Sequence, residues 1–219
     1  MPLHRPLAAL TAALLATAVL AGCAQSDWSA PHPDPTAVGE PAVGFAPATS
    51  PSPEATVHPA PGSWKNVHPS PGMRVVLLKA GSDRPTKTLV AAITSWANAE
   101  DVELRTVAAG DDLIDGIVQA MKLNPDLIVT AGNDLIDPLA TVTANHLDQQ
   151  FLVVGAEIAE PTGNVTAVDW TGASFRGEGL GMSSSYDAAS FTAERCGRGI
   201  RAGIAAVLTG MTGVVLWID

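Results

Sequence analysis

The chain has 219 residues, of which 47% are hydrophobic, and a formal net charge of −10. Its 12 lysines and arginines are outnumbered by 22 aspartates and glutamates. This balance argues against nucleic-acid binding, which depends on cations that neutralise phosphates, so no nucleic-acid partner is expected.

Residues 1–22 have the pattern of a secretion signal. After a weakly positive start, residues 7–20 form an apolar run too short to span a bilayer comfortably, and Leu20-Ala21-Gly22-Cys23 resembles a bacterial lipobox. In that chemistry Cys23 receives a diacylglyceryl group and becomes the new N-terminus. The sequence therefore predicts lipidation at Cys23, contact with membrane lipid there, and a place on the extracytoplasmic face of the cell membrane. The alternative is an ordinary signal peptide with a chance cysteine.

The other cysteine, Cys196, has no disulfide partner if Cys23 carries lipid. We expect Cys196 to be a small residue of the core.

Residues 23–72 are predicted to be a disordered linker that begins at the lipidated Cys23. They are rich in Pro, Ala, Ser and Thr and show neither the period of a strand nor that of a helix. Their prolines favour extended conformers, so we expect a semi-stiff spacer that holds a domain away from the membrane. Trp28 and Trp64 lie within this segment, and isolated aromatic residues in such linkers more often have no fixed partner.

Residues 73–219 are numerous enough for one domain with a real core. Apolar runs predict strands at residues 74–78, 102–108, 126–130, 151–155, 165–169 and 212–218, and helical spacing predicts helices at 86–99, 112–122, 135–146 and 188–208. This alternation predicts an α/β fold, a parallel sheet with helices on both faces. A long Gly/Ser loop at residues 170–190 is either mobile or pinned by its aromatic residues.

Small and polar residues follow four of the predicted strands. They read Ala80-Gly81-Ser82-Asp83, Ala109-Gly110-Asp111-Asp112, Ala131-Gly132-Asn133-Asp134 and Gly155-Ala156-Glu157. Ligands of parallel sheets bind beyond the carboxyl ends of the strands. We therefore expect a small polar ligand, rich in hydroxyl or amino groups, at a site lined by Ser82, Asp83, Asp112, Asn133, Asp134 and Glu157. The alternative is that the aspartates, or Asn133, only cap helices, which needs no ligand.

Signatures of catalysis are missing from the sequence. It contains no Gly-x-Ser-x-Gly elbow, no His-Glu-x-x-His, no Walker loop and no Gly-x-Gly-x-x-Gly directly after a strand. His32, His58 and His68 are too scattered to indicate a metal site. We expect a protein that is not an enzyme, with no cofactor and no metal.

The strand–helix order, residues 125–132 and residues 194–219 resemble the basic membrane protein group of substrate-binding lipoproteins. Within the last stretch, residues 202–206 look like that family's small-residue helix, and residues 212–217 look like the strand after it. The resemblance spans residues 73–219. It implies a type I periplasmic-binding fold, a nucleoside as ligand and an ABC permease as partner. The polar strand ends described above also suit a sugar.

By the layout of that family, residues 73–165 form a first lobe and a second lobe begins after about Val165. Residues 166–219 hold only its opening helix and one strand. Either most of a lobe is lost, or these residues complete the first sheet, or a homodimer shares the apolar strand 214–218, which would otherwise be an exposed edge. Two functions remain open: a receptor for a small polar solute, and a degenerate surface lipoprotein that acts as an interaction or structural module.

Overall fold

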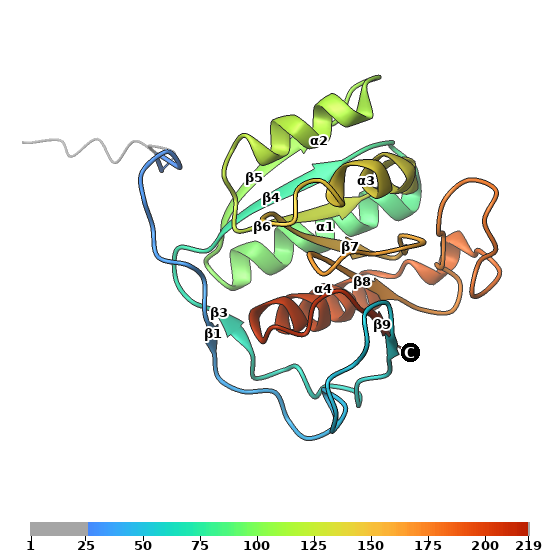
Figure 1. Cartoon of the computed structure of the whole chain (residues 1–219), viewed down its shortest axis with the longest axis horizontal. Helices are drawn as coiled ribbons and strands as arrows, with labels where there is room; N and C mark the ends of the chain where they lie inside the picture. Colours follow the sequence, from blue (N-terminus) through green and yellow to red (C-terminus); the bar gives the residue numbers. More distant parts are fainter. Residues whose placement is uncertain (1–25, 219) are drawn as a thin grey trace, which may run out of the picture.

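The computed structural model describes residues 26–218, so the predicted signal peptide and Cys23 lie outside the described residues. The predicted α/β fold is confirmed. A seven-stranded sheet has the order β2-β9-β8-β7-β6-β4-β5, every pair in it is parallel, and helices cover both of its faces (Figure 1).

The elements of the sheet alternate with helices along the chain. The strands are β2 (Thr56–Val57), β4 (Arg74–Lys79), β5 (Glu103–Ala108), β6 (Leu127–Ala131), β7 (Gln150–Val154), β8 (Val165–Asp169) and β9 (Val215–Trp217). The helices are α1 (Arg84–Ala99), α2 (Leu113–Met121), α3 (Ile136–Thr143) and α4 (Ala193–Leu208), with 3-10 turns η1 (Asn133–Leu135) and η2 (Ala188–Ser190). An antiparallel pair, β1 (Ala37–Val38) and β3 (His68–Pro69), stands apart from the sheet.

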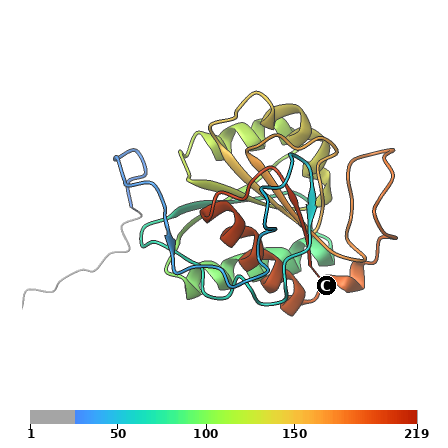
Figure 2. The same ribbon diagram turned by 60° about the horizontal axis from the view of Figure 1, so that its bottom comes forward.

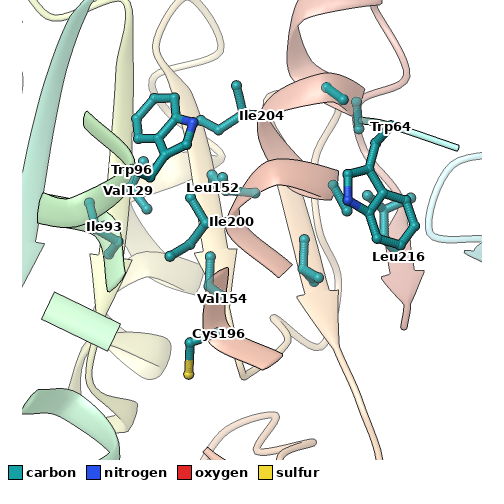
Figure 3. Packing of buried hydrophobic residues seen from close by; sticks show 14 of the residues in the cluster. Trp64, Ile93, Trp96, Val129, Leu152, Val154, Cys196, Ile200, Ile204 and Leu216 are labelled. Carbon is teal, nitrogen blue, oxygen red and sulfur yellow. The ribbon is translucent and has the colours of Figure 1, made fainter. Parts of the chain in front are cut away.

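Two hydrophobic cores lie on the two faces of the sheet because side chains of a strand alternate in direction. Val75 and Leu77 of β4 point into the core under α1 and α4, and Val76 and Leu78 point into the core under α2 and α3. Figure 3 shows the core under α1 and α4. There Gly203 lets α4 approach the sheet closely, since a Cβ at that position would lie 2.5 Å from a methyl carbon of Leu152.

Residues 26–72, here called the N-terminal strap, contradict the prediction of a disordered spacer. Trp28, Phe45 and Trp64 are 4%, 1% and 5% exposed, and the last two belong to the core under α1 and α4. The prediction failed because the strap is anchored by single aromatic residues separated by prolines. Such anchors leave no period of 2 or 3.6 in the sequence.

The strap also closes one edge of the sheet. β9 pairs with β8 on one side and with β2 of the strap on the other. Residues 166–218 therefore complete the sheet begun by residues 73–165, which was one of the three predicted arrangements. The exposed edge that suggested a strand shared between two chains is covered within this chain.

None of the helices in residues 26–218 combines the length and the apolar character needed to cross a bilayer.

Candidate ligand-binding site

The topology places a crevice between the carboxyl ends of β4 and β6. The chain continues from β4 to β5 on one side of β4, whereas β6 lies on its other side. Ligands of open α/β sheets bind at such a switch point, because the loops that leave the two strands diverge there. The crevice has a volume of about 50 Å³ and is lined by Asp83, Pro85, Thr86, Leu89, Gly132, Asn133, Asp134, Tyr186 and Phe191. Three predicted site residues, Asp83, Asn133 and Asp134, are thus brought together.

Gly132 allows the ends of β4 and β6 to meet at the crevice. Its φ is +120°, and a Cβ there would lie 2.1 Å from the carbonyl oxygen of Ala80, so a side chain does not fit. Next to it, the Oδ2 atoms of Asp83 and Asp134 each lie 3.4 Å from where a Cβ of Gly81 would be. Two carboxylates from different strand ends therefore converge on one backbone position.

Asp83 already has a structural task, as the capping alternative predicted. Its Oδ1 accepts a hydrogen bond from the backbone N–H of Thr86 at 2.9 Å, and its Oδ2 accepts one from the Thr86 hydroxyl at 2.7 Å.

Asp112 caps α2 in the same way by accepting from the N–H of Asp115 at 2.9 Å. Asp112 follows β5, and it does not line the β4–β6 crevice. Ser82 is exposed and is also not among the lining residues.

Asn133 and Asp134 differ from these caps. They begin η1, which has no side-chain cap, and within residues 26–218 neither side chain has a hydrogen-bond or ion-pair partner. Their polar atoms are therefore available to a ligand in the crevice.

Glu157 lies outside the crevice, in a separate polar cluster at the same edge of the sheet. It is 6% exposed. Its Oε2 lies 3.3 Å from Nε of Arg176, and its Oε1 accepts a hydrogen bond from the Ser183 hydroxyl at 3.0 Å. Glu157 thus holds the loop after β8. The sequence had predicted a single site for Glu157, Asp83 and Asp134, whereas in the structure Glu157 lies apart from the other two.

Asp169, at the end of β8, faces Glu157 and is fully buried. Its Oδ1 accepts from the N–H groups of Trp170 at 2.7 Å and Ser174 at 2.8 Å, while its Oδ2 is buried without a hydrogen-bond partner among the described residues. Burial raises the pKa of Asp169 to about 7, and Glu157 acts in the same direction, against the opposing effect of the Ser174 N–H. Asp169 could have been predicted from the sequence, because ligands of parallel sheets bind beyond the carboxyl ends of the strands and Asp169 is the last residue of the apolar strand β8.

Residues 170–191, here called the cover loop, lie over the carboxyl edge of the sheet (Figures 1 and 2). Trp170 is fully buried, its Nε1 donates to the Ser190 hydroxyl at 3.1 Å, and its ring meets Phe191 edge-on at a centroid distance of 5.1 Å. Phe191 and Tyr186 also line the crevice. The loop is therefore pinned by aromatic residues, one of the two predicted alternatives.

Cys196 of α4 is buried, and burial raises the pKa of its thiol to about 12. The prediction of a small core residue is confirmed. Such a thiol is a poor nucleophile.

No family model matches this chain, and no curated protein matches it. Among solved structures, it is similar to an ABC transporter solute-binding protein from Aeropyrum pernix K1 at 18% identity and a TM-score of 0.39, over 45% of this chain and 29% of that one. A solute-binding protein from Conexibacter woesei DSM 14684 is similar at 18% identity and a TM-score of 0.38, over 45% and 35%.

A third similar structure is a fragment from Peptoclostridium difficile 630 described as a "putative lipoprotein", at 18% identity and a TM-score of 0.44, over 64% of this chain and 99% of that fragment. The chain thus spans about a third of the length of the two solute-binding proteins, 29% and 35%. The resemblance to the basic membrane protein group stays a prediction.

Proposed function

We propose that this chain is a membrane-anchored bacterial lipoprotein, related to the substrate-binding proteins of ABC transporters, that binds a small polar solute such as a nucleoside or sugar. One observation carries the proposal. The crevice at the β4–β6 switch point presents Asn133 and Asp134, two polar side chains without partners among the described residues, in a lining shared with Tyr186 and Phe191.

The chemistry of the crevice favours an uncharged or cationic ligand. Asn133 offers a donor and an acceptor, and the carboxylate of Asp134 accepts hydrogen bonds from hydroxyl or amino groups. Tyr186 and Phe191 supply ring faces against which a sugar or a base can lie. Asp83 adds a second negative charge at the rim, which disfavours phosphate.

Ligand entry requires part of the cover loop to move. The crevice holds about 50 Å³, whereas small-molecule sites hold roughly 300–1,000 Å³. Tyr186 is 41% exposed and sits on the outer side, while Phe191 is 2% exposed and belongs to the core. We therefore expect Tyr186 to be displaced by a ligand and Phe191 to stay in place.

The lipid anchor is proposed at Cys23, from the lipobox sequence. An ABC permease is the proposed partner, because the proposed relatives are the solute-binding components of ABC transporters.

A thermal-shift screen of the non-lipidated chain 24–219 against nucleosides, sugars and amines tests the binding proposal. At a ligand concentration of one hundred times Kd, the free energy of unfolding should rise by about 2.7 kcal/mol. Asn133→Ala and Asp134→Ala should abolish the shift. Asp111→Ala, which removes an exposed carboxylate at the same edge outside the crevice, should keep it. A shift that survives both crevice substitutions would place the ligand elsewhere.

The alternative is a degenerate surface lipoprotein that acts as an interaction or structural module. The small volume of the crevice favours it, because about 50 Å³ bounded by Tyr186 and Phe191 is too little for a nucleoside or sugar. The same screen separates the two functions. If no chemical class raises the melting temperature, the result supports the interaction or structural module.

A further inference from the structure

We propose that the N-terminal strap holds the domain directly at the membrane surface, with the amino ends of the strands toward the lipid headgroups and the candidate site facing away. The inference rests on the lipid anchor at Cys23 in the proposed function. It replaces the long spacer expected from the sequence by a short, fixed attachment.

The attachment is built around Trp28, which is 4% exposed. The guanidinium carbon of Arg105 lies 4.2 Å from the centre of the indole ring, and that of Arg74 lies 5.9 Å from it. The indole Nε1 donates to Oε2 of Glu103 at 2.6 Å. Cation–π contacts and a charge-assisted hydrogen bond thus hold one aromatic side chain against the starts of β4 and β5.

The backbone around Trp28 is held as well. Arg74, which is 7% exposed, donates to the carbonyl oxygens of Trp28 and Ala30, both at 3.0 Å. Arg105 donates to the carbonyl oxygen of Ser26 at 2.5 Å, and the Ser26 hydroxyl donates to Glu103. The chain is therefore attached to the domain from the first residue that the structure describes.

A second contact lies a short way along the strap. Nε2 of His32 lies 2.8 Å from Oδ1 of Asp126, which directly precedes β6. Asp126 also accepts from the backbone N–H of Arg74 at 2.7 Å through its Oδ2. The same carboxylate joins the strap to the amino ends of two central strands.

This attachment shortens the tether to three residues. Ser26 follows Cys23 by three positions, and a fully extended chain of that length spans at most about 11 Å. A free coil over residues 23–72 would instead have an average reach of roughly 40 Å. A lipid on Cys23 therefore brings the surface around Ser26 to within about 11 Å of the headgroups.

The direction follows from the parallel sheet. Ser26 and Trp28 contact the starts of β4 and β5, whereas the crevice and the cover loop lie at the carboxyl ends. A strand of six residues spans about 20 Å, so the two regions are separated by the thickness of the domain. Figure 1 shows the start of the strap, in blue, and the cover loop, in orange, at opposite ends of the sheet. A solute reaches the crevice from the side away from the membrane.

Energy transfer from the lipidated full chain to a dye-labelled lipid in phosphatidylcholine–phosphatidylglycerol vesicles tests this orientation. The donor dye is placed on Lys122→Cys or Asp111→Cys, exposed positions at the two ends of α2. The pair differs mainly in position along the strands, by about 15 Å. The buried Cys196 thiol stays unlabelled. Transfer should be several-fold greater from position 122 than from position 111.

The matched control inserts a flexible Gly/Ser spacer between Cys23 and Ser26, which leaves every contact of Trp28 in place. It should lower the transfer from position 122 and remove the difference between the two positions. Equal transfer in the protein without the spacer, when flotation and mass show it to be lipidated and membrane-bound, overturns this inference alone. A chain that carries no lipid and does not float overturns the anchor of the proposed function, and this inference with it.

Discussion

Val57 lies opposite Leu216 in parallel register, so a residue of the N-terminal strap closes the edge of the sheet formed by the last strand. The pairing is supported by the core, because Val57 and Leu216 belong to the same hydrophobic cluster as Phe45 and Trp64. The strap is therefore part of the folded unit, and a fragment beginning at residue 73 would lose an edge strand and three buried aromatic side chains, Trp28, Phe45 and Trp64.

Trp64→Ala should lower the free energy of unfolding by about 3–5 kcal/mol, because it removes a large side chain that is 5% exposed and leaves a cavity between the strap and α4. Urea denaturation measures the change. Val43→Ala is the matched control, since Val43 lies in the same strap and is 99% exposed; it should leave the midpoint unchanged. An unchanged midpoint in Trp64→Ala would mean that the strap is not bound in solution.

Asp83→Ala should lower the free energy of unfolding by about 1 kcal/mol, because the N–H of Thr86 loses its capping acceptor. Asp83→Asn should cost much less, because asparagine caps helices nearly as well. Asp134→Ala should leave stability unchanged, since that exposed side chain has no partner among residues 26–218. Urea denaturation of the three variants separates capping from ligand binding. A loss in Asp134→Ala as large as in Asp83→Ala would contradict the assignment.

Gly155→Ala should destabilise the protein by about 2 kcal/mol or more and loosen the cover loop. Gly155 has a φ of +77°, and a Cβ there would lie 2.5 Å from Cε1 of Phe191, which closes the crevice. The ring of Phe191, which meets that of Trp170 edge-on, would have to shift. Limited proteolysis within the cover loop and thermal melting measure both effects. Gly181→Ala is the control, because no atom lies within 4 Å of its added Cβ; cleavage equal in the two variants would refute the role of Gly155.

Stability should depend on pH through Asp169. Its pKa is raised from 3.8 to about 7 in the folded protein, chiefly by burial and also by the facing Glu157, which is itself paired with Arg176. Between pH 3.8 and about pH 7, Asp169 keeps its proton in the folded chain and loses it in the unfolded chain. The resulting stabilisation is complete below about pH 4 and is lost as the pH rises through about 7.

Urea denaturation at about pH 5 and about pH 8 should therefore show a less stable protein at the higher pH, all else being equal. Asp169→Asn should flatten this dependence, because an amide keeps the acceptor for the N–H groups of Trp170 and Ser174 but does not titrate. Asp111→Asn, at an exposed position, should retain the slope of the unmodified chain. An equal slope in Asp169→Asn would assign the dependence to another group.

The sequence predicted the alternation of strands and helices between residues 74 and 217 because each of those elements carries its own periodic pattern. α4 begins at Ala193 and not near residue 188, since Thr192 caps it and Phe191 leaves the helical backbone conformation. Capping by Asp83 and Asp112 could also be predicted from the sequence, because a helix cap joins residues only three positions apart.

Which of the predicted site residues lie together could not be predicted from the sequence, because it depends on the order of the strands in the sheet. Asp83 and Asp134 share a crevice because β4 and β6 are neighbours in space, although β5 separates them in sequence. The same order leaves Asp112 beyond β5 and gives Glu157 a partner in Arg176 of the cover loop.

Local patterns in this chain thus determined the fold class, the main elements and the helix caps, because hydrophobic periodicity and capping act over a few residues. Tertiary structure alone decided the path of the strap, the covered edge of β9 and the closure of the crevice by Phe191. Each of these depends on single side chains that meet residues far away in the sequence, as Trp28 meets Arg105. Such contacts are made by the folded sheet and leave no periodic trace in the chain.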